Sequence, residues 1–339
     1  MIPHLVRRRL LAGLALAGVM TLGACGDQPS QRATSTKELT FSILSAENQA
    51  SMGPIWQPLL DDMSAQIGVK VKPYFATNYT SLIEAMRFNQ VQMGWFSALP
   101  ALEATRRAQG EVLGRVVDAG GEDSYLSVLI VKKGSGLTLD KVLQCDRTLN
   151  FGLGDAKSTS GTLAPMTYLF TPRNIEPAKC FKAVRSASHQ ANAFSVANGL
   201  VDVATNNTVG LLFLQRQSPQ TAEKIEVIWR SPPIPESSIV VRKDMDPALK
   251  EKIRQFFLTY GVGEGPDKDR QREVLKAMTY GGFRAADNSY LDPIREMEAA
   301  EAVADARRSG DQGRIAKAQA EFDKIQAAAA QKRAKEPDV

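Results

Sequence analysis

Three hydroxyl residues in a row, Ser158, Thr159 and Ser160, stand between a predicted strand and a predicted helix. The first backbone N–H groups of a helix have no partner within it, so amides and hydroxyls at such a turn can together hold a tetrahedral oxyanion. The glycine at position 161 would let the backbone approach closely. The alternative is an ordinary helix cap, although a cap needs one hydroxyl and this turn has three.

Further polar side chains are expected at the same edge of the second half of the chain. His189 precedes a predicted helix, and Asn206 and Asn207 end the next predicted strand. His189 could donate a hydrogen bond to an anion, or it could be a structural residue of the core. A third possibility is an exported hydrolase with His189 as general base and Ser158 or Ser160 as nucleophile. Three hydroxyls beside backbone amides favour a binding cradle over a single activated serine.

Two tyrosines of the first half are candidate contacts for the same ligand. Tyr79 precedes a helix for which Thr80 is the expected cap, and Tyr125 begins a strand. Each combines an apolar ring with one hydroxyl, so each could close over a ligand or simply pack at the surface. Trp95 and Phe96, at the end of another strand, are expected in the core.

Alternating strands and helices predict an α/β architecture that would bring these residues together. Apolar residues at a four-residue step over residues 55–67 predict a helix behind the first strand, and the pattern restarts after residues 134–136. Two α/β units joined by crossing strands near residues 130 and 238 predict two lobes with a ligand cleft, closing by a hinge. The C-terminal part predicts an amphipathic helix packed on its own lobe.

Composition excludes several classes of protein. The 339 residues are 43% apolar and 23% charged, which is typical of a globular chain large enough for two lobes. The net charge of +5 falls to about +2 without Arg7, Arg8 and Arg9, and no basic tract is dense enough to follow a nucleic acid. No group of residues has the spacing of metal ligands, so we expect neither a metal nor a cofactor.

The N-terminal segment has the pattern of an export signal. Three arginines precede an apolar run over residues 10–22, which is short for a membrane span. The sequence Leu-Gly-Ala-Cys that ends at Cys25 looks like a bacterial lipobox. We expect cleavage before Cys25, a lipid on that residue and a location in the periplasm. The alternative is a plain secretory signal.

Two other cysteines, Cys145 and Cys180, would then remain in an oxidising compartment. Such a pair predicts one disulfide, with two buried thiols as the alternative.

Taken together in their order along the chain, these segments resemble the phosphonate-binding periplasmic component of an ABC importer, a family with the type II solute-binding protein fold. The resemblance extends over about residues 40–296. The stretches that carry it are residues 81–89, 150–155, 158–161, 188–193, 196–198, 201–207, 227–232 and 260–261.

The resemblance implies a role for each candidate residue. The three hydroxyls of residues 158–160 would hold the phosphonate oxygens, His189 would donate a further hydrogen bond, and Tyr79 and Tyr125 would close over the ligand. Asn206 and Asn207 remain candidates only from their position at a strand end, where an amide could bind the ligand or a loop carbonyl.

The family's aminoethylphosphonate binder uses two carboxylates for the ligand's ammonium group. The corresponding positions here are Val209 and Ser237, with Glu236 adjacent. A buried ammonium without an anionic partner is costly, so this pattern favours an alkylphosphonate, phosphite or phosphate. Glu236 would restore the contact if its loop were shifted by one residue.

These inferences predict a two-lobed α/β solute-binding lipoprotein with C-terminal helices, and not an enzyme. Its partners would be a phosphonate-like anion, an ABC permease with its ATPase, and the membrane through the lipid on Cys25, but no nucleic acid. Phosphite and inorganic phosphate are the alternative ligands. The expected parts are a signal peptide (1–24), a tether (25–37), a first lobe (38–131 and 240–290), a second lobe (132–239) and a helical tail (291–339).

Overall fold

The computed structural model describes residues 38–44, 46–47 and 49–335. The expected signal peptide, tether and lipidated Cys25 lie outside these residues. No helix within the described ranges is long and apolar enough to cross a membrane.

The first lobe is built on a six-stranded sheet with the order β13-β4-β12-β3-β1-β2. Strands β1, β2 and β3 are parallel, whereas β4, β12 and β13 pair antiparallel. The strands are β1 (Glu38–Ile43), β2 (Lys70–Phe75), β3 (Met93–Phe96), β4 (Gly110–Asp118), β12 (Ser238–Arg242) and β13 (Tyr280–Ala285). Its helices are α1 (Gln49–Ile67), α2 (Tyr79–Arg87), α3 (Ala98–Arg107), α9 (Pro247–Thr259) and α10 (Pro266–Ala277).

The helix predicted behind the first strand is α1, and its buried face contains the apolar residues that recur every four positions in the sequence. Trp56, Leu59 and Met63 are buried, and the Trp56 ring lies 5.3 Å from Phe41 of β1. Burial of these large side chains provides most of the driving force that holds α1 on the sheet.

Neither α10 nor β13 was predicted. Gly281 weakens the strand pattern, yet a side chain there would meet the backbone of Asp118.

The second lobe is built on a five-stranded sheet with the order β10-β6-β9-β7-β8. It comprises β6 (Ser127–Lys132), β7 (Asn150–Leu153), β8 (Ala183–Ser186), β9 (Val203–Asn207) and β10 (Ile225–Arg230). Helices α4 (Leu139–Val142), α5 (Pro177–Cys180), α6 (His189–Ala197), α7 (Thr208–Gln217) and α8 (Pro219–Ala222) accompany them, with the π-helical turns η1 (Thr159–Leu163) and η2 (Met166–Phe170) and the 3-10 turn η3 (Thr171–Arg173).

Apolar residues alternate between the two faces of this second sheet. Leu129 and Val131 of β6 pack into the cluster around Phe151 and Phe181. Val128 and Ile130 of the same strand pack into the cluster on the other face. A strand covered on both faces reads as a continuous apolar run, which is why β6 was predictable.

Two connections cross between the lobes, and their positions correct the expected boundaries. The crossing segments pair as β5 (Ser124–Tyr125) and β11 (Ile234–Pro235). All of β6 belongs to the second sheet and all of β12 to the first. The expected boundary after residue 131 therefore falls inside β6, and the one after residue 239 falls inside β12. Hydropathy does not show which sheet an apolar strand joins, because β6 and β12 are both buried along almost their whole length.

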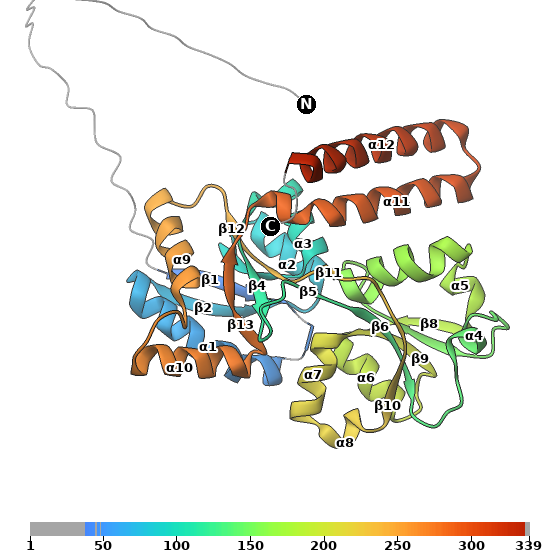
Figure 1. Cartoon of the computed structure of the whole chain (residues 1–339), viewed down its shortest axis with the longest axis horizontal. Coiled ribbons are helices and arrows are strands. Elements are labelled where there is room, and N and C mark those ends of the chain that lie inside the picture. Colours follow the sequence, from blue (N-terminus) through green and yellow to red (C-terminus); the bar gives the residue numbers. More distant parts are fainter. Residues whose placement is uncertain (1–37, 45, 48, 336–339) are drawn as a thin grey trace, which may run out of the picture. The chain divides into compact units, whose positions relative to one another are not determined.

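The tail is a helical hairpin and not a single helix (Figure 1). After η4 (Asn288–Leu291), α11 (Asp292–Ser309) ends at Gly310, whose φ of 70° suits glycine, and α12 (Gln312–Lys335) returns along it. The tail was expected on its own lobe, yet α11 contacts both. Glu298 pairs with Arg106 of α3, and Glu301 accepts a hydrogen bond from Thr171 of the second lobe.

Cys145 and Cys180 are joined by a disulfide in the structure. It ties the segment after α4 to the end of α5, within the second lobe. Neither cysteine lines the cavity described next.

Candidate functional site

A cavity of about 40 Å³ lies between the lobes, at the carboxyl ends of the parallel strands of both sheets. This is the edge at which open α/β sheets bind ligands. Its wall combines apolar residues with a small number of polar groups, as expected for a small-molecule site. The residues that carry the argument are Glu47, Met52, Tyr79, Trp95, Ser97, Tyr125, Glu236 and Ser237 from the first lobe and its crossing segments, with Ser160, His189, Asn207, Val209, Gly210 and Phe213 from the second.

The serine turn, residues 155–161, is both a helix cap and part of the site. Ser158 precedes η1, and its Oγ accepts a hydrogen bond of 2.9 Å from the Gly161 amide. Gly161 packs so closely on the Cα of Gly154 that a side chain would not fit. Ser160 lines the cavity, whereas Ser158 lies directly behind it.

Thr159 has a different role from the expected one. Its Oγ1 accepts a hydrogen bond of 2.9 Å from the Leu99 amide of α3 and lies 3.3 Å from Ser97 Oγ. Thr159 is fully buried and does not line the cavity. Its hydroxyl therefore joins the turn to the first lobe, and is not a free donor for a ligand.

His189 links the two serines. Its Nε2 lies 3.4 Å from Ser158 Oγ and 3.3 Å from Ser160 Oγ. Burial lowers the pKa of His189 to about 4, so the imidazole is neutral at physiological pH. Among the described residues, its Nδ1 has no hydrogen-bond partner, and hence no carboxylate orients the ring as a general base would require.

The two asparagines at the end of β9 have different roles. Asn206 donates from its amide to the backbone oxygen of His189 at 2.8 Å, so it holds that residue in place and does not line the cavity. Asn207 lines the cavity and donates to Ser160 Oγ at 3.1 Å.

The two tyrosines reach across from the first lobe to the serine turn. The Tyr79 hydroxyl hydrogen-bonds Ser158, and the Tyr125 hydroxyl hydrogen-bonds Ser160. Burial raises the pKa of both phenols above the ordinary value, so both remain protonated donors. The expected helix cap at Thr80 is wrong: Asn78 caps α2, because its side chain accepts the Ser81 amide.

Two carboxyl groups also line the cavity. Glu236 accepts hydrogen bonds from the amide and hydroxyl of Ser237 at 2.8 and 3.0 Å, while burial raises its pKa. Glu47 lies between β1 and α1, where burial raises its pKa to about 8. Val209 lines the wall and brings no charge. Within the described residues, no lysine or arginine lines the cavity, and no group of side chains could hold a metal ion.

Sequence reasoning did not find Glu47 or Ser97, and it placed Trp95 only in the core. Trp95 is buried, but it also lines the cavity, and its Nε1 has no partner among the described residues. One signal was available: Glu47 and Ser97 each follow the carboxyl end of a parallel strand, β1 and β3.

Comparisons with known proteins agree with this geometry. The family model for the periplasmic substrate-binding protein of phosphonate ABC transporters matches residues 41–291. The phosphonates-binding periplasmic protein of Escherichia coli (strain K12) is 40% identical over 290 residues, which cover 85% of this chain and 84% of that protein.

Two solved structures are similar as well. A binding protein component of an ABC phosphonate transporter from Pseudomonas aeruginosa superposes with a TM-score of 0.83 at 36% identity, covering 88% of this chain and 99% of that one. PhnD1 from Prochlorococcus marinus (MIT 9301), solved with methylphosphonate, has the same fold, with a TM-score of 0.68 at 21% identity over 77% of this chain and 97% of that one.

These matches confirm the expected type II periplasmic binding fold and leave no support for the hydrolase alternative. The chain belongs to the family of periplasmic substrate-binding proteins of phosphonate ABC transporters, and is a transport component rather than an enzyme.

Proposed function

We propose that this protein captures a phosphonate in the cavity between its lobes and delivers it to the permease and ATPase of its transporter. The supporting observation is a convergence of neutral donors, namely the side chains of Tyr79, Tyr125, Ser160, His189 and Asn207. Such donors stabilise an oxyanion strongly in a buried site, because little water competes for them. Ser158 would support the cradle from behind through Tyr79 and His189.

The rest of the wall favours a ligand with a substituent on phosphorus. Met52, Trp95, Val209 and Phe213 present apolar surface to the cavity. Phosphite and inorganic phosphate have no carbon to place there, whereas an alkyl or aminoalkyl group would gain by its burial.

Glu47 would discriminate between neutral and cationic substituents. With a pKa of about 8 it is mostly protonated at neutral pH, and then can donate a hydrogen bond. An ammonium group beside it would favour the ionised form instead. Glu236 is already engaged by Ser237, and Val209 has no charge, so Glu47 is the carboxyl group that a cationic substituent would use.

We also propose that the mature protein is anchored by lipid on Cys25, with residues up to 37 as a tether. The support is the lipobox-like sequence that ends at Cys25.

The first prediction concerns ligand preference. Methylphosphonate and ethylphosphonate should bind more tightly than phosphate and phosphite, by about fourfold for each buried carbon, because burying one methylene contributes about 0.8 kcal/mol. Isothermal titration calorimetry of the purified protein with the four anions measures this. Tightest binding of phosphate would favour the inorganic alternative, and release of phosphate from a phosphonate would contradict a purely binding role.

The second prediction concerns Ser160. The Ser160→Ala variant loses the hydroxyl that joins Tyr125, His189 and Asn207, so its affinity for every phosphonate should fall by about 5- to 150-fold, as expected for loss of a charge-assisted contact of ~1–3 kcal/mol. Calorimetry measures the dissociation constant. Ser195→Ala, on α6 and away from the cavity, is the matched control and should bind as the wild type does.

The third prediction concerns pH. The ratio of the affinities for 2-aminoethylphosphonate and ethylphosphonate should be higher in the wild type than in Glu47→Gln, and this advantage of the wild type should grow between pH 6 and pH 9, because Glu47, with a pKa of about 8, ionises as pH rises. The variant is the necessary reference, because the ammonium group lowers the pKa of the phosphonate head of 2-aminoethylphosphonate and the two ligands therefore titrate differently on their own. Calorimetry at each pH measures the four dissociation constants. A ratio that changes with pH in the same way in wild type and Glu47→Gln would show that Glu47 does not face the substituent.

The fourth prediction concerns the anchor. In cells supplied with a labelled fatty acid, the wild-type protein should incorporate the label, whereas Cys25→Ser should not, because it lacks the thiol that would carry the lipid. Immunoprecipitation followed by detection of the label measures this, and unlabelled wild-type protein would favour the plain secretory signal.

A further inference from the structure

The serine turn is attached to the first lobe at three positions, each two residues apart along the chain. Asp155 Oδ2 accepts a hydrogen bond of 3.2 Å from the Tyr79 amide. Lys157 Nζ forms an ion pair with Glu103 of α3, and Thr159 Oγ1 accepts the Leu99 amide. The turn that presents Ser160 is therefore fixed to the other lobe by contacts that can exist only when the lobes are together.

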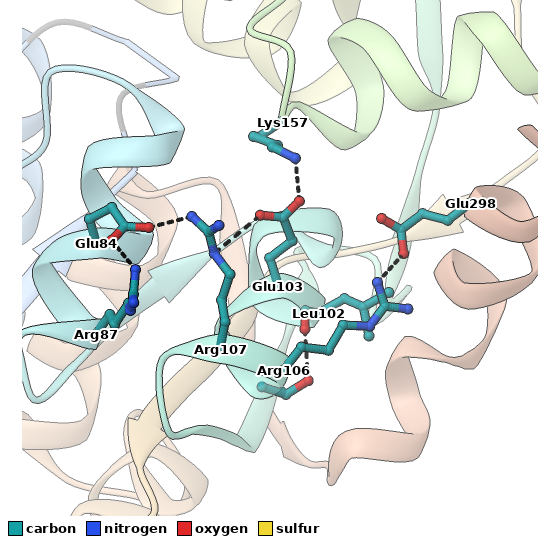
Figure 2. A network of polar contacts seen from close by, with 9 residues as sticks. Glu84, Arg87, Leu102, Glu103, Arg106, Arg107, Lys157 and Glu298 are labelled. Atoms are coloured by element: carbon teal, nitrogen blue, oxygen red, sulfur yellow. Dashed lines mark hydrogen bonds and ion pairs between the residues drawn. The ribbon is translucent and has the colours of Figure 1, made fainter. Parts of the chain in front are cut away.

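The Lys157–Glu103 ion pair differs from the other two contacts in two ways. Both of its partners are charged, and its acceptor, Glu103, belongs to the first lobe. The Glu103 side chain is only 12% exposed, whereas the Lys157 side chain is 37% exposed. The second oxygen of Glu103 lies 3.7 Å from Arg107 Nε, and Arg107 itself pairs with Glu84, which also pairs with Arg87 (Figure 2). Glu103 is thus held by a network within the first lobe before Lys157 approaches, so little side-chain freedom is lost when the pair forms.

We propose that Lys157 and Glu103 form a closure latch, a cross-lobe ion pair that stabilises the closed arrangement and positions the serine turn for the ligand. Most exposed ion pairs contribute little to stability, because water and salt screen both charges. Here the acceptor is largely buried, and its partner lies on the other lobe. Opening the lobes would leave Glu103 without Lys157 while the fold of each lobe stays intact. The ion pair therefore stabilises the closed arrangement of the lobes and not the fold of either lobe.

The latch rests on the proposed function only in that closure retains the ligand. Its residues touch neither the cavity nor the donors around it. Lys157 and Glu103 are consequently positioning residues, expected to change how long a ligand stays bound without changing which ligand is preferred.

The test is a double-mutant cycle on the full-length protein with Lys157→Met, Glu103→Gln and both together. Each single variant should release the ligand about three- to tenfold faster, and the double variant should be no worse than either single variant, since both remove the same interaction. Stopped-flow tryptophan fluorescence measures the release rate, because Trp95 lines the cavity. The difference from the wild type should shrink as sodium chloride is raised.

The matched control is Lys250→Met. Lys250 pairs with Glu111 at 2.6 Å, with side chains 19% and 30% exposed, but both residues belong to the first lobe. This variant should release ligand at the wild-type rate. Additive effects of Lys157→Met and Glu103→Gln, or release rates equal to that of Lys250→Met, would overturn the latch.

A second measurement does not depend on which ligand binds. Spin labels on Phe88→Cys and Leu200→Cys, exposed positions on the first and second lobes, report the inter-lobe distance by double electron–electron resonance. Lys157→Met should broaden the distribution toward longer distances, and Lys250→Met should not. A wild type that binds none of the phosphonates would contradict the proposed function, whereas identical distance distributions in wild type and Lys157→Met would overturn the latch itself.

Discussion

An oxyanion that leaves water must find hydrogen-bond donors on several sides, and the donors of the proposed site belong to two different lobes. Tyr79 and Tyr125 reach the serine turn from the first lobe, while Ser160, His189 and Asn207 come from the second. Neither lobe completes the set alone. Under the proposed function, binding and closure would for this reason be one event, with the paired crossing segments β5 and β11 as the expected hinge.

Burial also keeps two titratable groups of the cavity wall uncharged before a ligand enters. The same desolvation lowers the pKa of His189 and raises the pKa of Glu47, so both groups are held in their neutral forms near pH 7. Recognition would then depend on the positions of hydroxyl, amide and imidazole donors more than on net charge. Such a site can discriminate by geometry, because a misplaced ligand leaves buried donors unpaired.

Contacts outside the cavity extend the same closing surface. Asp155 and Thr159 bind the first lobe on either side of Lys157, and α11 contacts α3 through Glu298 and the second lobe through Glu301. The hairpin of α11 and α12 therefore touches both halves of the molecule (Figure 1). The stability of the closed arrangement is distributed over these polar contacts as well as over the ligand site.

Much of this protein could be predicted from its sequence, because the signals are local. The apolar step of α1, the continuous apolar run of β6 and the three hydroxyls before Gly161 each depend on a few consecutive residues. Because open α/β sheets bind ligands at the carboxyl ends of their strands, the sequence also predicted that the serine turn, His189 and Asn207 lie at one edge. The two tyrosines were candidates from their type and their place beside predicted elements, and the family resemblance favoured a ligand contact over surface packing for both.

Tertiary structure alone decided the rest. Glu47 and Trp95 look like ordinary residues near strand ends, and only the approach of the second lobe makes them parts of a cavity wall. The Thr159 hydroxyl, expected to contact the ligand, binds the Leu99 amide. The tail, expected as one helix on its own lobe, is a hairpin that touches both lobes. The physical reason is that sequence periodicity tells which face of an element is buried, whereas what covers that face depends on how distant segments meet.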